Sequence, residues 1–162
     1  MRILTVRQPW AWAIIHGGKN VENRVRNIAG TYRGPVAIHV GLQYDAAWSS
    51  RALDDAMQAS GARLGNPPMP WWSDEGHIIG VIDIVGGHHG PNTESSRFRS
   101  VRSCFQPGKP YGACSEWAEP DAFHLELAHP RALTTPIPYK GALGLRELPE
   151  TIAAQVLAEV RS

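Results

Sequence analysis

Runs of apolar residues along the chain predict short strands separated by long polar stretches. The expected strands, rich in Val, Ile, Leu and Phe, are residues 3–6, 36–40, 77–85, 123–128 and 143–145. Apolar positions three and four residues apart predict helices at residues 9–17, 46–60 and 149–160. Pro9 suits the first turn of a helix, Gly17 suits its end, and Asp45 is placed to cap the second helix.

The order of these elements indicates the fold class. Strands outnumber helices and are scattered among loops, which predicts an α+β fold, a small mixed β-barrel with helices packed at its ends. A length of 162 residues suits a single domain over residues 1–162, and we see no internal repeat or linker. Residues 123–128 alternate apolar and polar side chains, the pattern of a half-buried strand with His124 and Glu126 on its polar face.

Residues 86–120 show no convincing periodicity and are expected to form an irregular basic insertion. Gly, Ser, Pro and Arg dominate this stretch, and its basic residues are Arg97, Arg99, Arg102 and Lys109. A loop of this length in a compact domain is commonly functional or disordered. A basic flap that closes on phosphates and a solvated insertion are both consistent with the composition.

Charge is unevenly distributed, although the whole chain carries only +1. Residues 1–44 hold six basic groups and one acidic group, whereas the rest of the chain has a net charge of −4. Such segregation favours an anionic partner for the N-terminal part. We find no apolar run long enough to span a membrane and no secretory signal, and two cysteines suit a reducing compartment. We therefore expect a cytoplasmic protein.

Lys19, Glu22 and Arg24 place three charges directly after the first predicted helix. A solvated strand edge accommodates such residues, and so does a cleft. A partly desolvated lysine can act as a base or nucleophile, and a nearby carboxylate can orient it. Residues i and i+3 of a strand point to opposite faces, so Lys19 and Glu22 meet only if the backbone turns there. The alternative interpretation is a surface ion pair of little energetic value.

Several motifs together resemble the ASCH (activating signal cointegrator homology) domain of the PUA-like superfamily. The N-terminal motifs are Gln8-Pro9-Trp10-Ala11, the Gly-x-Lys-x-x-Glu-Asn-Arg pattern of residues 17–24, and a strand ending in His39. The C-terminal motifs lie in residues 113–118, 123–127 and 138–145. The resemblance covers both ends of the chain but not residues 45–63 and 86–112.

The resemblance implies a barrel fold and a role in nucleic-acid binding, to which most members of the family are assigned. One branch of the superfamily is an acetylcytidine amidohydrolase, which uses a lysine, a threonine three residues later and a distant glutamate. Lys19 matches that lysine, but Glu22 occupies the threonine position. This departure argues against the amidohydrolase activity and agrees with the broader ASCH pattern.

The predicted function is therefore binding of RNA through a basic cleft for a nucleotide or base. Single-stranded or structured RNA is favoured over duplex DNA because its bases can splay out and stack on aromatic rings. The candidate binding residues are Arg7, Trp10, Arg24, Arg26, His39, Arg97, Arg99, Trp117 and Lys140. Trp10 and Trp12 cannot share one helix face, so at most one is fully packed inward. His39 can equally be a satisfied core histidine.

Two alternatives remain open. The same cleft could belong to a hydrolase that acts on a modified nucleoside or on RNA, with Lys19 and Glu22 as the catalytic residues. The chain could instead be a protein-interaction scaffold that never meets nucleic acid. We expect no cofactor, because neither a Gly-rich phosphate loop nor a nucleophile elbow is present.

We also expect no metal site. His88, His89, Cys104 and Cys114 carry suitable ligand atoms, but their spacing matches no standard zinc module, in which ligands come in close pairs. Adjacent histidines also tend to point in different directions.

Overall fold

The computed structural model describes residues 1–45, 50–61, 74–90, 104 and 114–160. Its elements, in order, are β1 (Arg2–Gln8), α1 (Trp10–His16), β2 (Val21–Arg24), β3 (Gly34–Tyr44), α2 (Arg51–Ala59), β4 (His77–His89), β5 (Phe123–Pro138), β6 (Leu145–Glu147) and α3 (Glu150–Glu159). Each strand and helix expected from the apolar pattern is present with shifted bounds, and residues 46–49 of the expected second helix lie outside the described residues. β2 was not expected as a separate strand.

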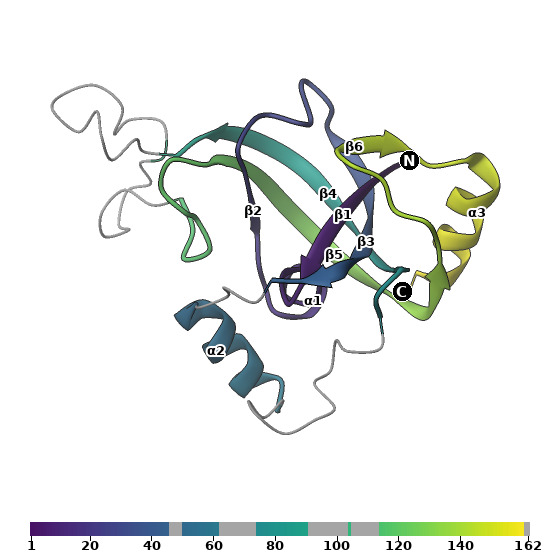
Figure 1. Ribbon diagram of the computed structural model, residues 1–162, viewed down its shortest axis with the longest axis horizontal. Helices are drawn as coiled ribbons and strands as arrows, with labels where there is room; N and C mark the ends of the chain where they lie inside the picture. The colour runs from purple at the N-terminus through teal and green to yellow at the C-terminus, as the bar shows by residue number, and fades with distance from the viewer. Residues whose placement is uncertain (46–49, 62–73, 91–103, 105–113, 161–162) are drawn as a thin grey trace, which may run out of the picture.

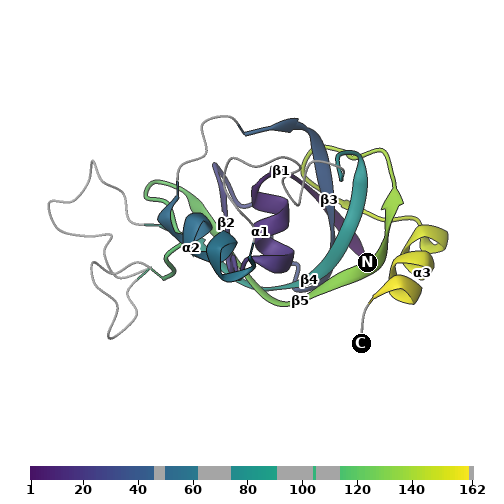
Figure 2. The same cartoon turned by 90° about the horizontal axis from the view of Figure 1, so that it is seen from below.

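The strands form one mixed sheet in the order β2-β5-β4-β3-β1-β6. β1 and β3 run parallel, and the other neighbouring strands run antiparallel. The sheet curves around α1, with α2 and α3 outside the curve (Figure 1, Figure 2). The α+β class is confirmed. The described strands do not close into a barrel, because β2 and β6 remain the two edges of the sheet.

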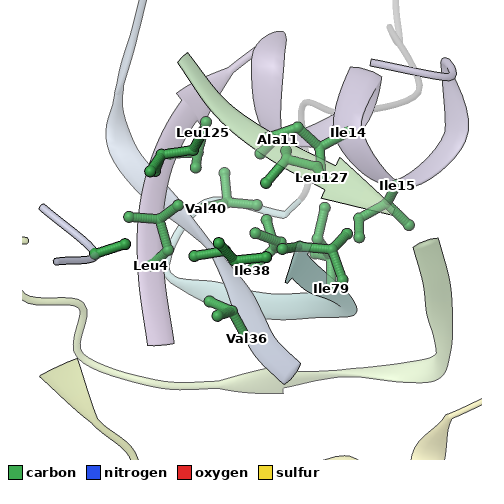
Figure 3. Packing of buried hydrophobic residues seen from close by; sticks show 14 of the residues in the cluster. Leu4, Ala11, Ile14, Ile15, Val36, Ile38, Val40, Ile79, Leu125 and Leu127 are labelled. Carbon is green, nitrogen blue, oxygen red and sulfur yellow. The ribbon is translucent and has the colours of Figure 1, made fainter. Parts of the chain in front are cut away.

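The main hydrophobic core fills the concave side of this sheet. Ala11, Ile14 and Ile15 of α1 pack against apolar side chains of β1, β3, β4 and β5 (Figure 3). Trp12 is buried and Trp10 is only partly buried, as their spacing predicts. The side-chain oxygen of Gln8 accepts a hydrogen bond from the backbone N–H of Trp12 at 2.9 Å, which fixes the start of the helix. The core thus holds α1 and the residues flanking it firmly against the sheet.

Several bounds differ from the expectation for identifiable reasons. β4 continues to His89 and β5 to Pro138, because the two strands pair as a long antiparallel ribbon that extends into the predicted insertion. α2 begins at Arg51 and is capped by Ser50, whereas Asp45 instead accepts a hydrogen bond from the indole of Trp10 at 2.9 Å. The alternation in residues 123–128 predicted that His124 would lie on an exposed polar face. This prediction was wrong, because His124 is fully buried.

A side chain links the two regions of the sheet that backbone pairing leaves apart. β2 pairs with β5 and lies near β1 without being joined to it in the ladder. Arg24 of β2 donates a hydrogen bond to the backbone oxygen of Thr5 in β1 at 3.0 Å. The side chain of Arg24 therefore joins β2 to β1, and a cavity lies next to this contact.

Candidate functional site

A cavity of about 820 Å³ lies beside the gap between β2 and β1. Its walls come from β1, β2, β3, the start of α1 and the segment that follows β5. Of the residues predicted from the sequence, those that line it are Arg7, Trp10, Lys19, Glu22, Arg24, His39 and Lys140. The N-terminal motif and the C-terminal motif therefore meet at one site, although more than a hundred residues separate them in the chain.

Lys19 and Glu22 meet at the floor of this cavity. Their Nζ and Oε2 atoms lie 3.7 Å apart, and both side chains are almost fully buried. Glu22 also pairs with Arg24, at 3.0 Å between Oε1 and a guanidinium nitrogen. Lys19 precedes β2, so the two residues do not lie on one continuous strand and the backbone turns between them. The sequence analysis required such a turn for Lys19 and Glu22 to meet. The buried carboxylate of Glu22 thus forms ion pairs with both Lys19 and Arg24.

The environment of Lys19 disfavours its charged form. Burial is the main cause that lowers the pKa of Lys19, and attraction to Glu22 opposes the shift without cancelling it. The ammonium donates to the backbone oxygen of Val21 at 2.5 Å. It also lies 5.5 Å from the ring centre of Trp10 and 5.8 Å from that of Trp117. A lysine held in this way is fixed in position and closer to its neutral form than an exposed lysine.

Three buried polar atoms on the cavity wall have no hydrogen-bond partner among the described residues. They are Oγ1 of Thr5, Nε of Arg24 and Nδ1 of His39. Native structures rarely leave such atoms unsatisfied. Arg24 Nε is a donor and the threonine hydroxyl can donate or accept. All three atoms are enclosed by protein, so a ligand can reach them only if neighbouring groups move.

The structure places His39 both in the core and at the cavity. The residue is only 3% exposed, and its Nε2 donates to the backbone oxygen of Tyr139 at 2.9 Å. That bond leaves Nδ1 as an acceptor, which is buried beside Gly141. Burial lowers the pKa of His39, which keeps the ring neutral near pH 7. The two interpretations of His39 left open by the sequence are thus compatible.

The cavity is less basic than the sequence suggested. Four basic and three acidic side chains line it, for a net formal charge of +1. Glu22 neutralises much of the charge of Lys19 and Arg24. Arg7 bonds to the amide oxygen of Gln43 at 2.9 Å, and neither Arg7 nor Lys140 has a carboxylate partner among the described residues. Positive charge without a carboxylate partner therefore lies at Arg7 and Lys140 and not at Lys19 and Arg24.

The remaining candidates lie elsewhere. Arg26 is exposed and does not line the cavity. Trp117 is 6% exposed and packs with Trp12 in a second apolar cluster, so it supports Lys19 instead of forming an open wall for a base. Arg97 and Arg99 fall outside the described residues, and the basic-flap interpretation stays a prediction.

Other cavity residues were missed by the sequence analysis. Thr5, Asp45 and Glu119 line the cavity. Asp45 was considered only as a helix cap, and Thr5 and Glu119 did not stand out, because a single threonine or acid beside a predicted element has no distinctive pattern. Gly141 lies within a motif that was noted, but the reason for glycine is spatial. A Cβ at this position would collide with the imidazole of His39 and would lie 2.8 Å from Oγ1 of Thr5. Glycine is therefore needed to bring this backbone against the two unpartnered polar groups.

Outside the cavity, the structure gathers three of the four residues considered as metal ligands. His88, Cys104 and Cys114 come together with His124, and their ligand atoms all lie within 4.8 Å of one another. His89 is not part of this group and packs edge-on against Phe123, with ring centres 5.0 Å apart. His124 was missed because it is separated from its partners in the sequence and occupies a position expected to be exposed.

The fold and the cavity at the open side of the sheet define an α+β protein with the architecture of ASCH-domain proteins. The supporting likeness is to the crystal structure of a mutant form of the ZmASCH protein from Zymomonas mobilis. The superposition has a TM-score of 0.51 with 15% sequence identity and covers 99% of this chain and 98% of the other. The resemblance inferred from the sequence motifs is thereby confirmed at the level of the fold.

Scans of the sequence against models of protein families and against curated proteins find no match. Among the described helices, none has the length and apolar character that crossing a bilayer requires.

Proposed function

We propose that the cavity binds an unpaired nucleotide of RNA. The observation that carries this proposal is the lining of the cavity, in which the indole of Trp10 lies with the side chains of Arg7, Arg24 and Lys140. A nucleobase has a flat face that stacks on an aromatic ring and an edge that carries donors and acceptors side by side.

The shape and the charge of the site support the same proposal. Trp10 lines the cavity and is only partly buried, so a base can stack on its indole. The hydrogen bond from Trp10 to Asp45 fixes the orientation of that ring. Arg7 and Lys140 carry the positive charge that is not compensated by carboxylates, and this charge suits the phosphates on either side of the base. The indole would hold the base, and the two cations would add affinity.

A binding assay across a salt series tests the proposal. Fluorescence anisotropy with short single-stranded RNA, duplex RNA and duplex DNA should show tightest binding to the single strand. Lys140→Ala should reduce the slope of log affinity against log salt by about 0.7, the value for one phosphate contact on a single strand. Trp10→Leu should weaken binding by about 1–3 kcal/mol and leave the salt slope unchanged.

Arg51→Ala is the matched control, because Arg51 is an exposed arginine on α2 that does not line the cavity. Equal losses for the control and for the cavity variants would show that binding is non-specific. Failure of all three nucleic acids to bind at low salt would refute the proposal.

A hydrolytic function is the second candidate, and the buried pair of Lys19 and Glu22 favours it. Because burial lowers its pKa, Lys19 is closer to the neutral form that can accept a proton from an attacking hydroxyl or water. Incubation of bound RNA, and of free modified nucleosides, followed by chromatography of the products, separates the candidates. Turnover that disappears in Lys19→Met would identify an enzyme, whereas intact substrate with wild-type protein would identify a binding domain.

A further inference from the structure

We propose that His88, Cys104, Cys114 and His124 bind one structural Zn²⁺ ion. Three contacts are close to, and slightly shorter than, the separations expected for ligands around a shared centre. Nε2 of His88 lies 3.3 Å from Sγ of Cys104, and Nδ1 of His124 lies 3.4 Å from that sulfur and 3.3 Å from Sγ of Cys114. Zinc at about 2.3 Å from sulfur and about 2.0–2.1 Å from nitrogen places neighbouring ligand atoms roughly 3.4–3.8 Å apart.

The hydrogen bonds of the two histidines direct a lone pair of each ring into the cluster. Nδ1 of His88 donates to the carboxylate of Glu126 at 2.6 Å, and in the neutral ring this leaves Nε2 as the acceptor. Nε2 of His124 donates to the backbone oxygen of Glu119 at 2.7 Å, which leaves Nδ1 unprotonated. Metal-bound histidines usually have such a carboxylate or carbonyl partner on the other nitrogen. Both imidazoles therefore have the tautomer that a metal requires.

Thiol–imidazole hydrogen bonds explain the arrangement less well. His124 offers one lone pair at Nδ1, yet two sulfur atoms approach that nitrogen at nearly equal distances. Cys104 in turn approaches both rings, although a thiol has a single proton to donate. One metal ion shared by the four ligand atoms explains this arrangement better than separate thiol–imidazole hydrogen bonds.

The surroundings are built to hold these side chains in place. His124 is fully buried, Cys104 is 2% exposed and Cys114 is 8% exposed. His88 and His124 are paired across the β4–β5 ladder, so the sheet itself sets their separation. A Cβ on Gly86 would collide with the carboxylate of Glu126, so glycine gives this carboxylate room to reach His88.

The ligand set indicates both the metal and its role. Two thiolates and two imidazoles in a tetrahedral arrangement suit Zn²⁺ better than Mg²⁺ or Ca²⁺, which prefer oxygen ligands. Four protein ligands leave no open position for a substrate, which is typical of structural sites. The ion would join β4, β5 and Cys104, which lies in sequence between the two strands.

This zinc site also connects to the cavity through one segment. Glu119 lines the cavity, and its backbone oxygen accepts the hydrogen bond from His124. The side chain of Asn23 in β2 bonds to the backbone oxygen of Trp117 at 2.9 Å and to the backbone N–H of Glu119 at 3.1 Å. The ion would therefore fix one wall of the cavity without entering it.

Metal analysis of the full chain tests the proposal without requiring RNA binding. Protein purified without chelators from cells grown with added zinc should contain one zinc ion per chain by mass spectrometry of the elements. Exchange with Co²⁺ should produce the visible absorption of tetrahedral cobalt and a sulfur-to-cobalt charge-transfer band. Both measurements use the wild-type chain, so they remain informative if ligand variants fail to fold.

Variants then assign the ligands. Cys114→Ser should abolish the charge-transfer contribution of that sulfur and weaken zinc binding. Glu126→Gln retains all four ligands and should weaken zinc binding by about 10–100-fold, since it removes the charged partner of His88. His89→Asn is the matched control, because this neighbouring histidine packs against Phe123 and should leave zinc binding unchanged.

Two results would overturn the proposal. One is a folded, reduced protein that holds no zinc and gives no cobalt spectrum. The other is a Cys104–Cys114 disulfide, detected as the loss of two hydrogen atoms in the intact mass, in protein that binds neither metal after reduction.

Discussion

Glu22 holds two cations at once, with Lys19 on one side and Arg24 on the other, and this makes the pair of Lys19 and Glu22 energetically asymmetric. Removal of the carboxylate leaves Arg24 without its ion pair and Lys19 with only the more distant carboxylate of Glu119. Removal of the lysine leaves Glu22 still paired with Arg24. The two partners of one ion pair therefore differ in how much the fold depends on them.

We expect Glu22→Gln to lower the free energy of unfolding by about 3 kcal/mol, near the cost of breaking a buried ion pair. Lys19→Met should cost clearly less, because methionine fills a similar volume and removes a charge that burial disfavours. Urea denaturation of the two variants measures the difference. Asp55→Asn on α2, which breaks an exposed pair with Arg51, is the control and should change stability by less than about 1 kcal/mol. Equal losses for Glu22→Gln and Lys19→Met would contradict the asymmetry.

The lowered pKa of Lys19 predicts how stability depends on alkaline pH. The unfolded chain binds a proton at Lys19 up to the usual pKa of 10.5, whereas the folded chain releases it at a lower pH. The contribution of Lys19 to the free energy of unfolding should therefore rise with pH between these two values, with a slope of at most about 1.4 kcal/mol per pH unit. At pH values below the pKa of Lys19 in the folded protein, Lys19 is charged in both states, and the full cost of burying this charge lowers the free energy of unfolding.

The difference in unfolding free energy between wild type and Lys19→Met, measured by urea titration at a series of pH values, isolates this effect. Burial raises the pKa values of Tyr32 and Tyr44, which acts in the opposite direction, but both proteins share these residues. A difference that stays constant up to pH 10.5 would show that Lys19 titrates normally in the folded protein.

Gly141→Ala and Gly41→Ala form a matched pair for testing the cavity wall. Both glycines line the cavity, but a Cβ on Gly141 would collide with the imidazole of His39, whereas one on Gly41 would meet its nearest neighbour at 3.4 Å. Gly141→Ala should displace His39, cost about 1–3 kcal/mol of stability and weaken RNA binding. Thermal melts and anisotropy measure these effects, and similar behaviour of the two variants would argue against a tight fit between Gly141 and His39.

Metal removal gives a further prediction, which depends on the zinc site proposed above. Zinc at a free concentration one hundred times its dissociation constant stabilises the folded state by about 2.7 kcal/mol. For a chain of this size, excess chelator should therefore lower the melting temperature by roughly 5–10 °C. The double variant Cys104→Ser/Cys114→Ser should melt at the same temperature with and without chelator. A wild-type melting curve insensitive to chelator would contradict a structural role for the metal.

The elements that the sequence predicted correctly are those set by local patterns. The apolar spacing around Ile14 and the flanking Pro9 and Gly17 define α1, and the spacing of Trp10 and Trp12 showed that one ring would be less buried. The requirement for a turn between Lys19 and Glu22 followed from strand geometry alone and is met in the structure. These features depend on residues close together in the chain.

The features that escaped prediction depend on how distant segments align. The burial of His124 follows from its register opposite His88, and this register cannot be obtained from the alternation within β5. The cap expected from Asp45 was wrong because α2 begins at Arg51 and Ser50 caps it, while the carboxylate of Asp45 accepts from the indole of Trp10. The three unpartnered polar atoms come together only when β1 pairs with β3 and Arg24 of β2 reaches β1. The expected closure of the barrel depends likewise on the meeting of strand edges and is not observed in the described strands.

The bond from Arg24 to Thr5 has a consequence for how such a protein can diversify. A backbone ladder is made by every residue of a strand, whereas this bridge between β2 and β1 is made by a side chain. A change at residue 24 therefore alters the contact between β2 and β1 beside the cavity without removing any backbone bond of the sheet. The wall of the cavity can vary in sequence at this position while the ladder of the six strands stays the same.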